Sequence, residues 1–132
     1  MASQPCPFCS LPQERIVDQN DLAIVLRDGF PVSPGHTLIV PKRHVGSYFE
    51  LTAHEVDAMQ SLLHRQKQAL DREHNPNSYN IGINDGPEAG QTVPHVHMHL
   101  IPRYRGDVSD PRGGVRWLIP AKADYWTDRE RP

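Results

Sequence analysis

Apolar residues recur along the chain with two different periods, and these periods predict its secondary structure. Short apolar runs, partly alternating with polar residues, predict strands over residues 15–19, 21–28, 36–42, 78–84 and 95–102. Asn20-Asp21, between the first two runs, is typical of a hairpin turn. Gly- and Pro-rich stretches between the other runs predict loops.

One long helix is predicted between the third and fourth apolar runs. Thr52 and Glu55 have the spacing of a capping box, and apolar residues then follow at helical intervals through about residue 73. Asn75-Pro76-Asn77 ends this pattern. Because strands and helices do not alternate in βαβ order along the chain, we expect an α+β domain with a mostly antiparallel sheet.

Length, charge and cysteine content limit the class of protein further. The length favours a single domain over residues 1–132, with an irregular N-terminus over 1–14 and an extended C-terminal tail over 104–132. The net charge of −2 gives no basic surplus for a nucleic-acid partner, and no apolar stretch reaches the roughly 18 residues of a membrane span. The N-terminus has no signal-peptide pattern, and there are only two cysteines. We therefore expect a cytoplasmic protein that binds neither nucleic acid nor membrane.

The stretch QTVPHVHMHLIPR, residues 91–103, places three histidines at alternate positions. On a strand, His95, His97 and His99 share one face, while the apolar residues between them face the core. We therefore expect the three imidazoles to open onto a cleft. Three interpretations fit: metal ligands, a nucleophile whose neighbours bind an anion, or a solvated face without a role.

The residues around the histidines favour attack on phosphorus. A nucleophilic histidine must be neutral and held in one tautomer, and donors must surround the anionic group that it attacks. Gly90, Gln91 and Thr92 in the preceding loop offer backbone N–H groups, an amide and a hydroxyl. His36, at the start of an apolar strand, could reach the same cleft. A pure metal site would instead ask for a nearby carboxylate or thiolate.

Three segments together resemble the histidine-triad (HIT) family. HVHMHLIP is similar to the family signature, NDGPEAGQTVP to the glycine-rich approach to it, and DGFPVSPGHTLIVPKRH to its nucleotide-binding segment. The resemblance covers roughly residues 20–105. It implies a HIT-like fold, with an antiparallel sheet of about five strands, one long and one short helix, and a two-fold homodimer.

The resemblance implies a nucleotide hydrolase that acts at an α-phosphate. His97 matches the nucleophile, which forms a covalent nucleotidyl-histidine. His99 and His36 match positions that bind the phosphate and steady the reacting imidazole, and Gln91 matches a phosphate-contacting glutamine. No metal is implied for the chemical step.

Two further positions match nucleotide contacts. Asp28 matches a position that takes the ribose hydroxyls, and a carboxylate can accept from both hydroxyls of a cis-diol. Asn84 matches a position that contacts the phosphate or the leaving group. LIPRYRGD and DGPEAGQTVPH favour the fragile-histidine-triad branch, which cleaves dinucleoside polyphosphates.

Several alternatives stay open at this point. They are a nucleoside phosphoramidase or nucleotidyl transferase of the same family, a non-catalytic nucleotide-binding regulatory module, and a phosphohydrolase with a metal on the triad itself.

CPFC, residues 6–9, offers two thiols near the N-terminus. The resemblance to bacterial family members and to related nucleotide-sugar transferases implies a structural zinc site that two histidines complete. Its ligands would be Cys6, Cys9, His44 and His95. Two free thiols on a loose N-terminus are the alternative.

The dimer expected from the resemblance has several candidate contacts. The helix face with Met59, Leu63 and Leu70 either meets the partner or packs on its own sheet. Trp117 and Trp126 could reach the partner's cleft. Four arginines either bind the phosphates of a long leaving group or serve solubility: Arg103, Arg105, Arg112 and Arg116. Three histidines are expected to face solvent without a role: His54, His64 and His74.

Overall fold

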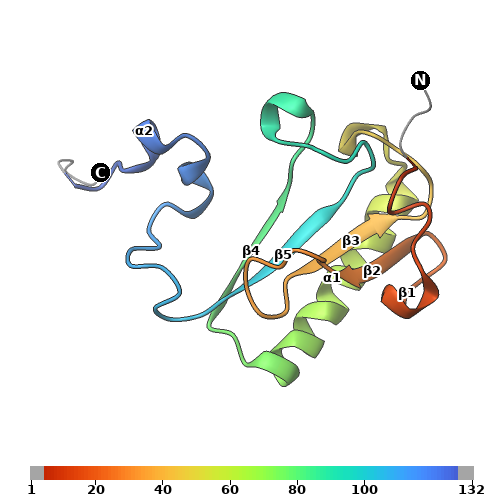
Figure 1. Cartoon of the computed structure of the whole chain (residues 1–132), viewed down its shortest axis with the longest axis horizontal. Coiled ribbons are helices and arrows are strands. Elements are labelled where there is room, and N and C mark those ends of the chain that lie inside the picture. The colour runs from red at the N-terminus through yellow and green to blue at the C-terminus, as the bar shows by residue number, and fades with distance from the viewer. Residues whose placement is uncertain (1–4, 128–132) are drawn as a thin grey trace.

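A single antiparallel sheet and one long helix form the centre of the molecule (Figure 1). This computed structural model describes residues 5–127; residues 1–4 of the expected N-terminus and 128–132 of the expected tail lie outside the described residues. The described strands follow the order β1-β2-β3-β5-β4, and every neighbouring pair is antiparallel. Their bounds are Ile16–Gln19 (β1), Ala23–Arg27 (β2), Thr37–Pro41 (β3), Ser78–Ile83 (β4) and Met98–Arg103 (β5), and the helices span Ala53–His74 (α1) and Pro120–Ala123 (α2). The predicted α+β class, with five strands, one long helix and one short helix, is confirmed.

The β1–β2 hairpin closes around Asn20, as the sequence predicts. The side-chain oxygen of Asn20 accepts hydrogen bonds from the N–H groups of Leu22 and Ala23, at 3.2 and 3.0 Å. An Asn side chain can imitate the backbone of a turn in this way. Asn20 Nδ2 also donates to the carbonyl of Ala58 in α1 at 2.9 Å, so the turn is tied to the helix.

Helix α1 begins and ends where the sequence predicts. Thr52 and Glu55 form the capping box: Thr52 Oγ1 accepts from the Glu55 N–H at 3.1 Å, and the Glu55 carboxylate accepts from the Thr52 N–H at 2.9 Å. Arg43 donates to the same carboxylate at 3.0 and 2.7 Å, and these bonds lower the pKa of Glu55 to about 2. Asn75 ends the helix at a φ of 48°, in the left-handed region that asparagine tolerates.

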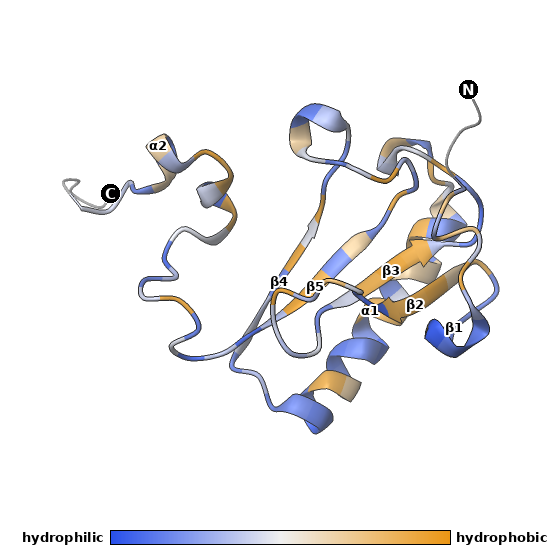
Figure 2. Ribbon diagram, viewed as in Figure 1, coloured by the Kyte–Doolittle hydropathy of each residue, from blue (hydrophilic) through white to orange (hydrophobic). Residues whose placement is uncertain are grey.

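The apolar face of α1 packs against the sheet, of which β2 and β3 are the most apolar strands (Figure 2). Met59, Leu63 and Leu70 are 2%, 9% and 0% exposed and lie in the core between helix and sheet. The interpretation of this helix face as a dimer contact is therefore wrong, because the three side chains are already buried within their own chain. His54, His64 and His74 lie on the exposed side, as expected.

Strand β5 begins three residues later than predicted, at Met98 instead of His95. The neighbouring strand β3 ends at Pro41, which has no N–H to continue the ladder. Nε2 of His95 is hydrogen-bonded to the Pro41 carbonyl at 2.8 Å. The Val96 N–H donates to the carbonyl of Val45 at 2.7 Å. The first histidine of the triad thus lies outside the regular sheet. The expected core-facing residues are buried against α1: Val96, Met98 and Leu100.

The opposite face of the sheet is covered unevenly. Over β2 and β3, the buried side chains of Leu26, Leu38 and Val40 pack under Phe8 and Leu11 of the N-terminal segment. The β4–β5 half of this face is not covered by that segment. This half carries the candidate site.

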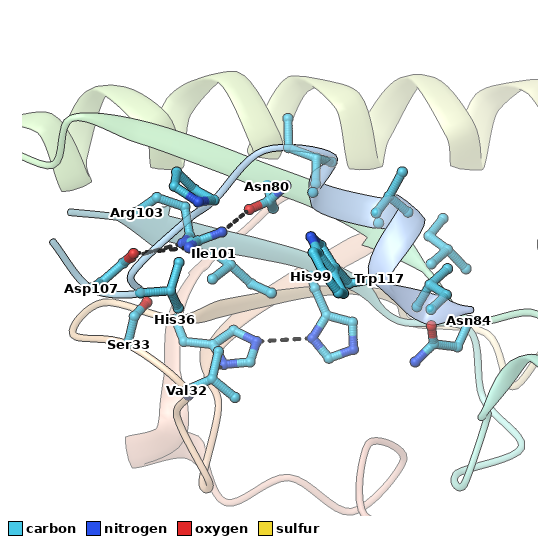
Figure 3. Close-up of a pocket in the computed structure, with 18 of the residues that line it drawn as sticks. Val32, Ser33, His36, Asn80, Asn84, His99, Ile101, Arg103, Asp107 and Trp117 are labelled. Carbon is cyan, nitrogen blue, oxygen red and sulfur yellow. Dashed lines mark hydrogen bonds and ion pairs between the residues drawn. The ribbon is translucent and has the colours of Figure 1, made fainter. Parts of the chain in front are cut away.

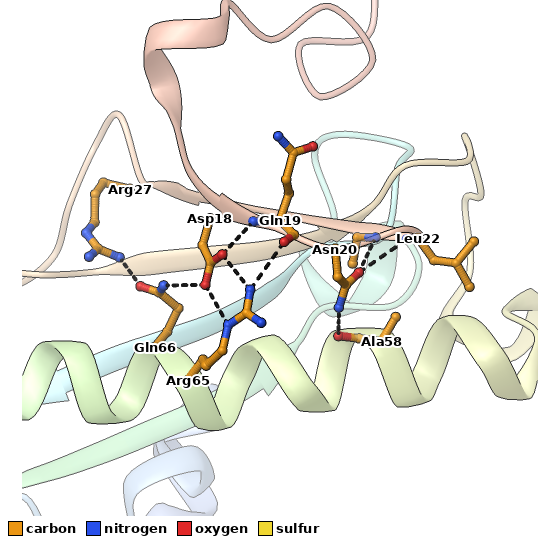
Figure 4. A network of polar contacts seen from close by, with 9 residues as sticks. Asp18, Gln19, Asn20, Leu22, Arg27, Ala58, Arg65 and Gln66 are labelled. Carbon is orange, nitrogen blue, oxygen red and sulfur yellow. Dashed lines mark hydrogen bonds and ion pairs between the residues drawn. The ribbon is translucent and has the colours of Figure 1, made fainter.

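A polar network joins β1 and β2 to α1 (Figure 4). Arg65 donates to both carboxylate oxygens of Asp18, at 2.9 and 2.5 Å, and these bonds lower the pKa of Asp18. Arg27 donates to the side chains of Gln66 and Thr37, at 2.7 and 2.8 Å. Because Gln66 and Thr37 are buried, these bonds satisfy polar groups that burial would otherwise leave unpaired.

The C-terminal segment follows β5 and extends beyond the edge of the sheet in the view of Figure 1, and part of it lies over the β4–β5 face, where it lines a cavity with residues of both strands. It contains a short 3-10 helix over Gly114–Leu118 and then α2. Trp117 and Trp126 pack on each other, with 6.5 Å between ring centroids. Among the described residues, no helix is both long and apolar enough to cross a membrane.

Candidate active site

His97 is held in the tautomer that a nucleophile requires. Its Nδ1 lies 2.8 Å from the backbone carbonyl of His95, and only a protonated nitrogen can donate to a carbonyl. Nε2 of a neutral His97 therefore carries the lone pair. The residue is 8% exposed, and the Phe8 ring packs on it with 5.1 Å between centroids. The arrangement presents one imidazole nitrogen as a base or nucleophile.

His36 and His99 form a second ordered pair beside it. The N–H of Val32 donates to His36 Nδ1 at 3.1 Å, so the proton of a neutral His36 sits on Nε2. That Nε2 lies 2.9 Å from Nδ1 of His99, which must then be the acceptor. The proton of His99 is thereby placed on its Nε2. The His99 ring lies 5.2 Å from the His97 ring, so an N–H donor stands beside the candidate nucleophile.

Burial keeps this pair neutral. Burial is the largest cause, and together with the neighbouring rings of His97 and His36 it lowers the pKa of His99 to about 4. Burial also lowers the pKa of His36, although the Asp28 carboxylate opposes that shift. At neutral pH both rings therefore act as hydrogen-bond donors without a net charge.

Asp28 approaches the pair from the end of β2. Its Oδ2 lies 3.4 Å from His36 Nε2, and its Oδ1 accepts from the N–H of Phe30 at 2.8 Å. Asp28, His36 and His99 bring their ligand atoms within 4.8 Å of one another, as a metal site would. The tautomers oppose a metal there, because the His36 Nε2 that faces the group is protonated when its Nδ1 accepts from Val32.

Gln91 closes the loop that precedes the triad. Its side-chain oxygen accepts from the Gly86 N–H at 2.8 Å, and its amide nitrogen donates to the carbonyls of Gly46 and Val93, at 2.8 and 3.1 Å. Both amide hydrogens are thus in use, which makes Gln91 a loop-holding residue in this structure. A direct contact of Gln91 with phosphate stays a prediction.

The other predicted nucleotide contacts near the loop differ in their exposure to solvent. Gly90, at a φ of 95°, and Thr92 are exposed. Asn84 is partly buried and lines the larger cavity beside the histidines. Contacts of Gly90 and Thr92 with a nucleotide likewise stay predictions.

This cavity has a volume of about 790 Å³ and lies between the β4–β5 face and the C-terminal segment (Figure 3). His36, His99 and Asn84 line it in that order in the view of Figure 3, with Trp117 beside His99. His97 and His95 do not belong to its lining. The expectation that all three triad histidines open onto one cleft is therefore wrong, because His95 and His97 are buried and only His99 faces the space.

Three of the four arginines after the triad have side-chain partners within the chain. Arg103 donates to Asp107 at 2.8 and 2.9 Å and to Asn80 at 2.7 Å, and the first pair lowers the pKa of Asp107. Arg105 is exposed. The remaining pairs are Arg112 with Asp110, and Arg116 with the carbonyls of Lys122 and Ala123.

A separate cluster brings Cys6, Cys9, His44 and His95 together, with one ligand atom of each within 4.8 Å of the others. His95 Nδ1 lies 3.4 Å from the Cys6 sulfur and 3.5 Å from the Cys9 sulfur. His44 Nδ1 lies 3.2 Å from the Cys9 sulfur and 3.2 Å from His95 Nδ1. Four ligands around a tetrahedral zinc stand roughly 3.3–3.8 Å apart, given the usual zinc–ligand distances.

The donor set fits zinc chemically as well. Two thiols and two imidazoles form one of the usual structural combinations. The Nε2–H of His95 donates to the Pro41 carbonyl, so Nδ1 keeps the lone pair that a metal needs, in the manner of an outer-shell partner. The structure thus turns His95 away from the cavity and toward the cysteines.

Sequence reasoning missed two residues of this region and expected a third in a different place. Phe8 was only part of an irregular N-terminus, yet its ring packs on His97. Ser33 lines the cavity from the loop just before His36, and the sequence did not single it out. Trp117, expected as a candidate for the partner's cleft, lines the cavity of its own chain. Phe8 and Trp117 could not be assigned to this site from the sequence, because each reaches it through contacts that are distant along the chain.

The HIT domain family model matches residues 12–106. This chain belongs to the HIT family. The match contains β1 to β5, α1 and the three histidines, and it ends before the C-terminal segment that walls the cavity.

Named relatives and a solved structure agree with this assignment. An uncharacterized 16.1 kDa HIT-like protein of Mycoplasma pneumoniae is 34% identical over 79% of this HIT chain and 75% of its own length. The asymmetrical bis(5'-nucleosyl)-tetraphosphatase of Schizosaccharomyces pombe is 41% identical over 61% of this chain and 44% of its own, so the chain spans less than half of that relative. The crystal structure of a HIT family protein from Bacillus anthracis superposes with a TM-score of 0.74 at 34% identity, over 80% of this chain and 78% of that one.

Proposed function

We propose that this chain is a nucleotide hydrolase that cleaves at the α-phosphate of a dinucleoside polyphosphate, through a nucleotidyl intermediate on His97. The observation that carries the proposal is the 2.8 Å bond from His97 Nδ1 to the His95 carbonyl. This bond leaves Nε2 unprotonated and fixes its direction. A module that only binds nucleotides has no use for such a nitrogen.

Two displacements account for the reaction. His97 Nε2 attacks the α-phosphorus, so a P–N bond forms while the P–O bond to the leaving phosphate breaks, and the leaving oxygen keeps that electron pair. Water then attacks the same phosphorus and gives up a proton to solvent. The P–N bond breaks, its electron pair returns to Nε2, and a mononucleotide departs. One water is consumed in each cycle.

The neighbouring residues stabilise and position the reacting phosphate. The Nε2–H of His99, a ring that lies 5.2 Å from the His97 ring between centroids and lines the cavity, is assigned to a phosphate oxygen, because donors that are already oriented stabilise the charge that develops there. Asp28 is assigned to the ribose hydroxyls and Asn84 to the leaving side. Gly90, Gln91 and Thr92 are assigned to the phosphate, and Gln91 would have to exchange its bond to the carbonyl of Gly46 or Val93 to donate to it.

Relatives support the substrate class. The Schizosaccharomyces pombe relative is named as a bis(5'-nucleosyl)-tetraphosphatase, and its 41% identity makes a dinucleoside polyphosphate the first substrate to test. The phosphoramidase, transferase and binding-module alternatives differ from the proposal in leaving group, acceptor or turnover.

A structural zinc ion on Cys6, Cys9, His44 and His95 is part of the proposal. When bound, it would join the N-terminal segment to the chain just ahead of β5. Because Phe8 lies between the two cysteines and packs on His97, the metal would also hold that ring in place. The chemical step uses no metal.

The homodimer expected from the resemblance is proposed on the edge strand. β4 lies at one end of the sheet, and among the described strands it pairs with β5 alone. An exposed edge offers unpaired backbone groups to a second chain. Light scattering during gel filtration would give twice the monomer mass if the proposal holds.

The stereochemistry at phosphorus tests the covalent step. A substrate whose α-phosphorus is chiral through oxygen isotopes and sulfur would be hydrolysed, and the configuration of the product determined. Two displacements give retention, whereas direct attack by water gives inversion. Inversion would overturn the nucleotidyl-histidine.

Product analysis tests the substrate class. Wild type and His97→Ala would be incubated with diadenosine tetraphosphate and with adenosine 5′-phosphoramidate, with and without a chelator. We expect AMP from the tetraphosphate, resistant to brief chelation, and a loss of more than about 10⁴-fold in the variant. AMP from the phosphoramidate alone would favour the phosphoramidase, and no AMP from either would favour a binding module.

A further inference from the structure

We propose that the larger cavity binds the leaving half of the substrate, and that Trp117 stacks on its aromatic base. The inference rests on the proposed function, because it assumes that the α-phosphate reacts at His97. It adds a residue that selects substrates by their leaving group, on a segment beyond the HIT match.

The cavity begins where the reacting phosphate would lie. His99 lines it and stands beside His97, with 5.2 Å between the rings. Asn84, which matches a leaving-group contact, lines the same space. Figure 3 shows Trp117 next to His99 and Asn84, over the β4–β5 face. A group that leaves phosphorus on this side would enter the cavity directly.

The walls suit a flat apolar ligand. The sheet contributes Ile81, Ile83 and Ile101, and the C-terminal segment contributes Trp117 and Leu118. The volume of about 790 Å³ falls within the usual range for small-ligand pockets, which are mostly apolar with a few polar groups. Aromatic side chains stack on bases of any kind, because every base has a π-face.

Trp117 is held in place while its ring stays accessible. Its Nε1–H donates to the Arg112 carbonyl at 2.7 Å, and the Trp126 ring packs at an interplanar angle of 65°. Gly113 permits this packing: its φ is 90°, and a Cβ there would lie 3.0 Å from Trp126. Trp117 is nevertheless 46% exposed, so part of its surface is free for a ligand.

One polar group at the histidine end lacks a partner. Ser33 Oγ is the single buried side-chain N or O without a hydrogen bond in the described part of the chain, residues 5–127. Ser33 lines this cavity and also a smaller one beside Asp28 and His36. Because the Ser33 side chain lines both spaces, a turn of its buried hydroxyl toward them would give it a partner in a ligand that extends between them, such as a polyphosphate chain.

The test compares two substrates that share the AMP half. Diadenosine tetraphosphate has an aromatic leaving group, and adenosine 5′-phosphosulfate has a leaving group without a ring. For Trp117→Ala we expect KM for the first to rise about tenfold, as the loss of one stacking partner implies, and KM for the second to stay within about twofold. Trp117→Phe keeps a ring and should recover most of the difference. Tyr125→Ala, an equally exposed aromatic outside the cavity, should behave as wild type.

Three outcomes would overturn the inference: equal losses on both substrates, no change on either, or a Trp117→Ala variant whose mass in solution differs from wild type. The last would assign the surface to a second copy of the chain. If wild type releases no AMP at all, the proposed function fails, and ligand binding then tests the inference about Trp117 independently of turnover. A methylene-bridged diadenosine tetraphosphate should then bind more tightly than AMP, and Trp117→Ala should remove that advantage.

Discussion

Nε2 of His36 lies 2.9 Å from Nδ1 of His99, and this one bond fixes the proton positions on both rings. It does so because Val32 already donates to the other nitrogen of His36. The only donor left on the pair is the Nε2–H of His99, beside the nucleophile. The tautomer of His99 therefore depends on the β2–β3 loop, because Val32 of that loop supplies the bond that fixes His36.

His36→Ala should lower kcat by about 10²- to 10³-fold, the usual effect of removing an oriented donor that supports the transition state. Without His36, the proton of His99 is free to move to Nδ1. Steady-state kinetics on diadenosine tetraphosphate would measure the change, and His64→Ala, an exposed histidine on α1, is the control.

His36→Gln separates this role from general support of the fold. The glutamine amide can still donate to His99 Nδ1, so part of the lost kcat should return. If His36→Ala and His36→Gln are equally impaired, His36 does more than set the tautomer of His99.

Stability should fall as the pH drops from about 6.5 toward 4. The pKa of His99 is about 4 in the folded chain and near 6.5 when unfolded, so the unfolded chain binds a proton first. The shift corresponds to about 3 kcal/mol of stability, fully present above pH 6.5 and lost by about pH 4. Urea unfolding across this range should be less pH-dependent for His99→Asn, whereas His64→Asn should match wild type.

Zinc removal should destabilise the chain more than it slows the chemistry. Bound zinc at a hundred times its Kd would contribute about 3 kcal/mol. After chelation we expect a lower Tm and a near-normal initial rate at low temperature. His44→Ala should abolish stoichiometric zinc in metal analysis, and His54→Ala, which lies outside the cluster, should retain it.

Glu55→Ala should cost about 1–3 kcal/mol in the free energy of unfolding, because it removes a capping-box partner and leaves Arg43 and the Thr52 N–H unmatched. Urea denaturation would measure it. Glu73→Ala is a suitable comparison, since Glu73 is 55% exposed and lies 3.6 Å from Arg27, and a loss under about 0.5 kcal/mol is expected there. Equal losses in the two variants would contradict this account of the helix start.

The sequence predicted the local structure well because each signal lies within a few residues. The capping box of Thr52 and Glu55, the turn at Asn20 and the stop at Asn75 all act over short separations, and the structure contains each of them. The start of β5 shows where such reasoning fails. The His95 ring bonds to the carbonyl of Pro41, more than fifty residues away, and the β3–β5 ladder begins only at the pair of Ile39 and Met98.

Periodicity and motif spacing encode the order of the elements, the buried face of α1 and the HIT signature, so these features follow from the sequence alone. The direction in which each histidine faces depends instead on tertiary contacts. His95 turns to the cysteines because the Pro41 carbonyl takes its other nitrogen, and His99 turns to the cavity beside His36. The cavity wall at Trp117 was decided in the same way, since it exists only where the C-terminal segment meets the sheet. These contacts join distant parts of the chain, and no local pattern records which partners folding will bring together.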